Sequence, residues 1–132
     1  MKIKLNNPFY AVGEIDNKTA REAHIQAAAI FITRDVLAHI QTRHPRELAA
    51  MGLTPEAFVE KILNNYTEIR KGSRGSYLLT VPGKKLHDVA AIGLEIRLSG
   101  LYNFWLIKTA FPMSTRQIAS KTLIYTKKKP TR

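Results

Sequence analysis

The spacing of apolar residues changes near residue 64, and this change constrains the fold more than any other feature of the 132-residue chain. Before it, apolar residues recur at helical spacing, and after it they alternate. The alternation is clearest over residues 88–98, where every second position is apolar, which is typical of a half-solvated antiparallel strand. Helices followed by such strands predict an α+β domain, in which N-terminal helices pack on one face of a roughly four-stranded antiparallel sheet.

Capping residues mark the expected helices. Asp16 or Asn17 begins a segment that runs to about residue 29, and Thr33 begins one over residues 34–43 that ends before Pro45. A third helix starts at Thr54, followed by proline at its first position. Apolar residues form a stripe along one face of this helix, which predicts that this face packs in the core. The stripe consists of Phe58, Val59, Ile62 and Leu63.

Four strands are expected, over residues 66–70, 76–81, 88–98 and 104–111, with glycines in the first turn. Short apolar pieces at residues 30–32 and 123–125, and a possible short helix after Ser114, complete the pattern. The length fits one domain over residues 1–132, with its core at about 16–125 and a basic tail at 126–132 that we expect to be mobile.

Several classes of site find no support in the sequence. The chain has no cysteine, which excludes disulfides, thiolate nucleophiles and Cys-ligated zinc, and no metal-binding or phosphate-loop motif is present. We therefore expect neither metal nor cofactor. The longest apolar run, residues 27–32, is too short to cross a bilayer, so we expect a soluble protein.

The net positive charge of the chain comes entirely from its second half. Residues 1–68 hold eight basic and eight acidic residues, a balance of zero, whereas residues 69–132 hold thirteen basic and two acidic residues, a balance of +11. Such segregation favours a polyanionic partner, most often nucleic acid, although a basic face can also serve only solubility.

The sheet face without helices is expected to display this charge. Cations for phosphates and flat rings for unpaired bases are what single-stranded RNA recognition uses. Trp105 and the neighbouring tyrosines Tyr66, Tyr77 and Tyr102 supply the rings, or else belong to the core. The candidate RNA-binding residues are Arg74, Lys84, Lys85, Arg97, Trp105, Lys108 and Arg116.

The segment from His39 to Pro45 concentrates groups suited to acid/base chemistry. His39, Arg43 and His44 place two imidazoles and a guanidinium within six residues at a helix end. His39 and Arg43 share a helix face, and the proline favours a bend that brings His44 towards them. The alternative is two exposed histidines near a helix C-terminus, whose dipole favours cations. Isolated His24 and His87 are more typical of surface or core.

The order of these motifs resembles the phage-associated branch of the barnase/EndoU/colicin/RelE-like (BECR) ribonucleases. The resemblance covers about residues 25–115, and it rests on the helix that ends His-Ile-x-x-Arg-His-Pro and on the late strand Leu-Ile-Lys-Thr-Ala-Phe-Pro at residues 106–112. It implies a metal-independent endoribonuclease toxin domain that cleaves RNA, with tRNA as the expected substrate. It also implies an acidic immunity protein as partner, and action in the bacterial cytoplasm after possible delivery as the C-terminal part of a larger toxin.

Matched residue by residue, the resemblance assigns His44 and Arg43 to the helix-end motif and Thr109 to the hydroxyl residue of the late strand. His39 and Arg70 are further candidates for the same catalytic site. His44 or His39, or both, would transfer protons, Arg43 and Arg70 would bind phosphate, and Thr109 would donate a hydrogen bond to a phosphate oxygen. Lys108 would point to the opposite face from Thr109 if the strand is regular.

Two non-enzymatic alternatives remain open. The basic sheet could belong to a nucleic-acid-binding module of a phage or mobile element, with the histidine segment only a helix end. The second alternative is a structural domain that docks an acidic protein through the same basic face. Glu68 and Glu95, which could act as carboxylate bases, are more typical of a strand surface.

Overall fold

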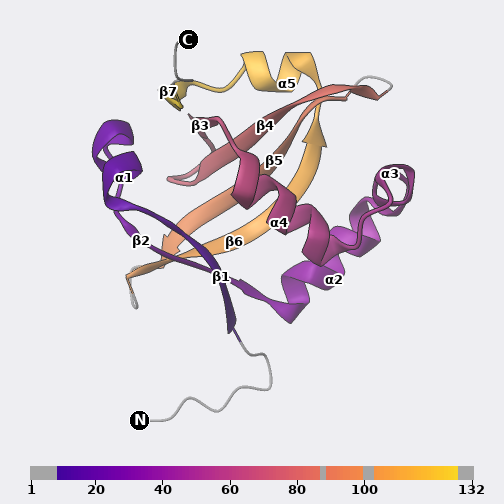
Figure 1. The fold of residues 1–132 in the computed structure, drawn as a ribbon, viewed down its shortest axis with the longest axis horizontal. Coiled ribbons are helices and arrows are strands. Elements are labelled where there is room, and N and C mark those ends of the chain that lie inside the picture. Colours follow the sequence, from indigo (N-terminus) through magenta and orange to yellow (C-terminus); the bar gives the residue numbers. More distant parts are fainter. Residues whose placement is uncertain (1–8, 87–88, 100–102, 128–132) are drawn as a thin grey trace.

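A computed structural model describes residues 9–86, 89–99 and 103–127, and within these ranges the side chains of residues 10–81, 91–99 and 103–127. The described chain forms one seven-stranded sheet with the strand order β1-β2-β6-β5-β4-β3-β7. Five helices accompany it (Figure 1). All neighbouring strands are antiparallel except β2 and β6, which run parallel, so the sheet is mixed. The predicted roughly four-stranded antiparallel sheet with N-terminal helices on one face is therefore wrong, although the short helix expected after Ser114 is present.

The N-terminal segment accounts for part of this difference. Strand β1 (Phe9–Ile15) precedes the short helix α1 (Asn17–Ala23), and β2 (Ala28–Thr33) follows it. Asp16 caps α1 as expected, but the helix ends at His24, which adopts a left-handed conformation with φ of 61°. The alanines at 28 and 29, which favour helix locally, lie instead in β2, where pairing with β1 fixes them.

The next helices follow the capping signals closely. Helix α2 (Arg34–Arg43) begins at the Thr33 cap and ends at His44, and α4 (Pro55–Asn65) begins at the Thr54 cap. Between them lies α3 (Pro45–Met51), which was not anticipated. Pro45 ends α2 and begins α3, because a proline at the first helical position lacks only an N–H that would have no partner there.

Strands β3 (Glu68–Lys71), β4 (Tyr77–Leu86), β5 (Val89–Ser99) and β6 (Phe104–Met113) form an antiparallel meander. Helix α5 (Thr115–Ala119) follows β6 and starts with a capping box between Ser114 and Gln117. Strand β7 (Leu123–Thr126) then pairs with β3 and ends the sheet. The weak apolar signals at residues 30–32 and 123–125 thus belong to two full members of the sheet.

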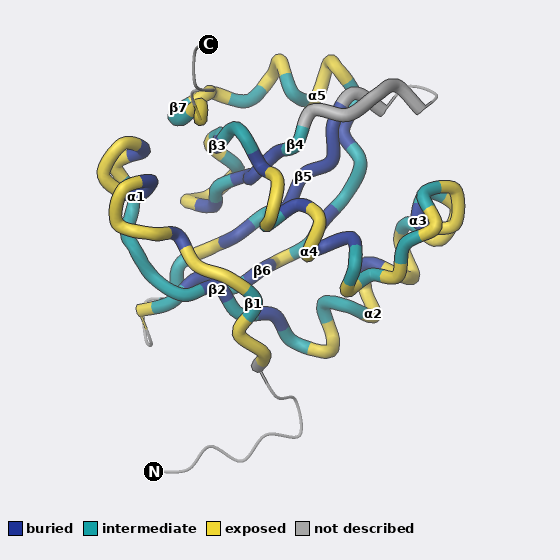
Figure 2. Tube along the Cα trace, in the orientation of Figure 1, coloured by how far each residue is buried: buried dark blue, intermediate teal, exposed yellow. Residues whose placement is uncertain are grey.

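The sheet curves around α4, which contacts β1 at one end and β4 and β5 further along (Figure 1). Its concave face carries the main core together with buried residues of α1, α2, α3 and α4. Buried segments accordingly run along the centres of the strands and the inward sides of the helices (Figure 2). The convex face, defined here as the side opposite α4, is contacted by α5 near β5 and β6.

Candidate functional site

The junction between α2 and α3 holds four ionisable side chains that lie close together in the sequence. His39 and Arg43 lie one helical turn apart on α2, and both are exposed. His44 follows directly and caps α2 by donating its backbone N–H to the carbonyl of Ile40 at 3.0 Å. Its side-chain Nδ1 lies 3.8 Å from a carboxylate oxygen of Glu47 in the first turn of α3. We call His39, Arg43, His44 and Glu47 the helix-junction cluster.

His44 is the most perturbed member of this cluster. Partial burial lowers the pKa of its imidazole below the ordinary value, and the charges of Arg43 and His39 lower the pKa further. The Glu47 carboxylate opposes these effects by favouring the charged imidazole. The net result is a histidine that is largely neutral at pH 7 and able to accept a proton. The bend that Pro45 was expected to impose is present, and Glu47 is the member that sequence reasoning missed.

Arg70 does not join the helix-junction cluster. Arg70 pairs with Leu78 on β4, and Leu78 pairs with Glu95 on β5. The residues on either side of Glu95 belong to the core of the concave face, so the Arg70 side chain lies on the convex face. Its guanidinium donates to Glu68 and to the carbonyl oxygens of Ile118 and Lys121, at distances between 2.9 and 3.2 Å. With its donors committed to the protein, Arg70 has the bonding pattern of a structural residue rather than a phosphate clamp.

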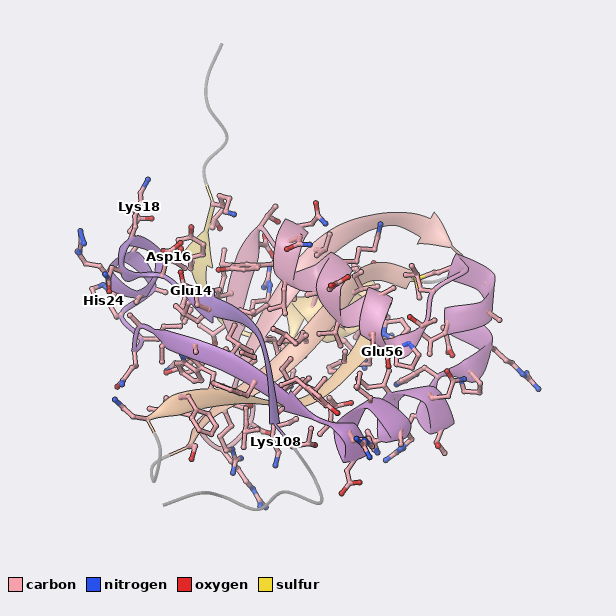
Figure 3. The ribbon with its side chains drawn as sticks, turned by 60° about the horizontal axis from the view of Figure 1, so that its bottom comes forward. Glu14, Asp16, Lys18, His24, Glu56 and Lys108 are labelled. Atoms are coloured by element: carbon pink, nitrogen blue, oxygen red, sulfur yellow. The ribbon has the colours of Figure 1, made fainter. Side chains whose placement is uncertain are left out.

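Thr109 also lies on the convex face. It pairs with Glu95, whereas Ile107 pairs with Ile96 and faces the core, so Lys108 is the extra residue of a β-bulge. The strand is therefore irregular where alternation was assumed, and the bulge turns the exposed Lys108 out of the ladder (Figure 3). Among the described residues, no hydrogen bond or ion pair joins Thr109 to the helix-junction cluster.

Trp105 is part of the core rather than of an RNA-binding surface. Its side chain is 1% exposed, its Nε1 donates to the carbonyl of Gln26 at 3.0 Å, and its ring meets Tyr77 edge to face at 5.7 Å. Tyr66 is buried as well. Of the two alternatives that the sequence left open for Trp105, RNA contact or core, this burial favours the core, because alternation in β6 directs the side chain to the concave face.

The remaining basic candidates are dispersed over the surface. Arg97 on β5, Lys108 on β6, Arg116 on α5 and Arg74 in the β3–β4 turn are exposed. Lys84 and Lys85 belong to β4, but their side chains lie outside the described residues, as do His87, Tyr102 and residues 128–132 of the tail. Phe104 and Phe31 are the rings that register places on the convex face near Arg97, with ring centroids 4.7 Å apart. The sequence did not predict that these two phenylalanines lie on the convex face, because an apolar residue is equally compatible with the core.

Comparisons with known proteins give no neighbour for this arrangement: no family model, no curated protein and no solved structure matches the chain. No helix in the described ranges has the length and apolar character needed to span a bilayer. The described side chains also contain no group of three or more His, Asp or Glu residues arranged to hold a metal ion.

Proposed function

We propose that this protein binds RNA and cleaves it by metal-independent acid/base chemistry at the helix-junction cluster. The observation that carries the proposal is the meeting of a half-buried neutral His44 with Glu47, Arg43 and His39 at one bend of the chain. Two imidazoles and a guanidinium are sufficient to deprotonate a ribose hydroxyl, protonate a leaving oxygen and balance the charge on phosphorus.

The chemistry follows from the protonation states. Neutral His44 takes the proton of the 2′-hydroxyl, and that oxygen forms a bond to the adjacent phosphorus. The bond from phosphorus to the 5′-oxygen breaks, and His39 is the proposed donor of the proton that the leaving oxygen needs. Arg43 balances the charge that gathers on the phosphoryl oxygens, and the Glu47 carboxylate favours the imidazolium that forms on His44. The products are a 2′,3′-cyclic phosphate and a 5′-hydroxyl.

RNA affinity is assigned to the second half of the chain. Its +11 balance supplies the long-range attraction, and the exposed side chains of Arg74, Arg97, Lys108 and Arg116 are the proposed phosphate contacts. Transfer RNA remains the proposed substrate, and a toxin role with an acidic immunity protein remains the proposed context, on the strength of the sequence resemblance alone.

The test is digestion of end-labelled total tRNA in EDTA by the full chain. We expect cleavage that leaves 2′,3′-cyclic phosphate ends, and a loss of about 10²–10⁴-fold in rate for His44→Ala. His24→Asn is the matched control, because it also removes an exposed imidazole and asparagine tolerates the left-handed backbone there. Equal rates for the two variants would contradict the assignment of His44.

A non-catalytic RNA-binding module is the second candidate, and two observations favour it. Arg70 is committed to structural hydrogen bonds, and Thr109 lies on the convex face, so the catalytic set expected from the resemblance is not assembled as a whole. This candidate predicts that wild-type protein binds tRNA and leaves it intact at every pH tested. Loss of both binding and cleavage at about 100 mM salt would contradict both candidates.

A further inference from the structure

The curved sheet stops at β1, and a hollow lies next to this last strand. In the described part of the chain, β1 pairs only with β2, so the opposite edge of β1 has no strand beside it. The hollow has a volume of about 360 Å³ and lies between β1, the start of α2 and α4. Six of its lining residues are Tyr10, Val12, Leu37, Glu56, Val59 and Glu60.

The hollow is apolar at the floor, and its rim carries two carboxylates, Glu56 and Glu60, and one guanidinium, Arg34. Buried Val59 and half-buried Val12 and Leu37 form the floor. Glu56 and Glu60, one turn apart on α4, are exposed and take part in no ion pair among the described residues. Figure 3 labels Glu56 on this helix. Tyr10 is 41% exposed, and its hydroxyl accepts from Arg34 at 3.1 Å, which holds Arg34 to the strand.

The position of α4 explains why a strand fits here. Over β4 and β5 the sheet covers α4, but beyond β1 the flank of α4 that carries Glu56 and Glu60 has no strand over it. A strand added to the edge of β1 would continue the curvature and turn every second side chain towards that flank. An apolar side chain would meet the floor of the hollow, and a basic side chain would meet the two glutamates.

We infer that the β1 edge binds an extended segment of a partner protein in which apolar residues alternate with lysine or arginine. Charge complementarity supports a basic occupant, because the lining of the hollow carries the two carboxylates of Glu56 and Glu60 against the one guanidinium of Arg34, which is held by Tyr10. The site is separate from the helix-junction cluster, so the inference does not depend on the proposed nuclease activity.

The probe is a fluorescein-labelled peptide of three Lys-Val repeats, titrated into the full chain and followed by anisotropy and by ¹⁵N–¹H NMR. We expect saturable binding, with shifts of amide resonances confined to β1 and the first turns of α2 and α4. The double change Glu56→Gln and Glu60→Gln should weaken binding at least fivefold, whereas Glu22→Gln on exposed α1 should not. A peptide N-methylated at alternate residues should lose binding, since it cannot pair with β1.

Three results would overturn the inference. The first is equal binding of a Glu-Val peptide, which would show that the glutamates do not select a basic segment. The second is NMR shifts confined to a surface that lies outside β1 and the adjoining parts of α2 and α4. The third is a concentration-dependent dimer in sedimentation that the Lys-Val peptide dissociates, which would make a second copy of this chain the occupant.

Discussion

Arg70 and Glu68, two residues apart on β3, form an ion pair at 2.9 Å in which both side chains are largely shielded from water. The same guanidinium bonds carbonyl oxygens 48 and 51 residues further along the chain, in α5 and just after it. This one side chain therefore connects β3 to the segment that leads into β7. Because Glu68 already neutralises it, Arg70 adds little to the positive field of the surface.

Replacing Arg70 should lower stability and leave RNA binding intact. Lysine cannot reproduce the planar fork of donors, so Arg70→Lys should reduce the free energy of unfolding by about 1.5–3 kcal/mol in urea denaturation. Arg74→Lys, at an exposed turn in the same hairpin, is the control and should change it little. A stable Arg70→Lys variant with weakened RNA affinity would restore Arg70 as a phosphate contact.

The single tryptophan offers an optical test of the assignment of Trp105 to the core. Trp105→Phe removes the hydrogen bond to Gln26 and leaves a cavity beside Tyr77, so we expect a loss of about 1–3 kcal/mol in stability. Saturating RNA should leave the tryptophan emission of the wild type unchanged. Strong quenching by RNA would show that a base reaches the ring after all.

The lowered pKa of His44 sets the direction of a pH effect on stability. The folded state binds this proton less readily than the unfolded chain, so stability is full above the ordinary pKa near 6.5 and falls as the pH drops towards the folded value. Urea titrations between pH 7.5 and 5 should show a shallower decline for His44→Gln than for wild type. Identical slopes would mean that burial does not penalise the imidazolium.

Two exposed cations should contribute to RNA binding through charge alone. Arg97→Ala and Lys108→Ala should each reduce the slope of log K against log salt by about one, the effect of losing one phosphate contact. Lys18→Ala removes the same charge from exposed α1 in the neutral half and serves as the control. Filter binding at several salt concentrations measures the slopes. If Lys18→Ala changes the slope as much as the other two, binding is spread over the whole surface.

Asp16 provides a test of local helix capping. Its carboxylate accepts from the backbone N–H of Thr19 at 2.8 Å, and this hydrogen bond lowers the pKa of Asp16. Asp16→Ala should cost about 1 kcal/mol, whereas Asp16→Asn keeps an acceptor and should cost less. Because the folded pKa is depressed, the difference between wild type and Asp16→Asn should be present above pH 4 and vanish as the pH falls through the folded value. Thermal unfolding at pH 3 and pH 7 would reveal this.

Local chemistry is enough to predict several elements of this fold. The cap at Thr54 with Pro55 begins α4, and Pro45 ends α2, because caps and prolines act through backbone atoms a few residues away. The residues of the helix-junction cluster are likewise neighbours in sequence, which is why three of its four members could be predicted.

The rest depends on contacts between distant segments. Strands β1 and β2 combine strand formers such as Phe9, Val12 and Ile30 with alanines and a glycine, and pairing between the two strands fixes where each begins and ends. Successive side chains of a strand point to opposite faces of the sheet, so a shift of one residue moves a side chain from one face to the other. The bulge at Lys108 and the register of β3 therefore decide which of the predicted site residues share a surface.

The sequence by itself determined the boundaries of α2 and α4 and the concentration of positive charge in the second half. The tertiary structure alone decided that the sheet has seven strands, that Trp105 is buried and that Arg70 and Thr109 lie across the sheet from α4. The physical reason is range: capping and charge are properties of a few adjacent residues, whereas strand pairing and burial depend on which distant residues the folded chain brings together.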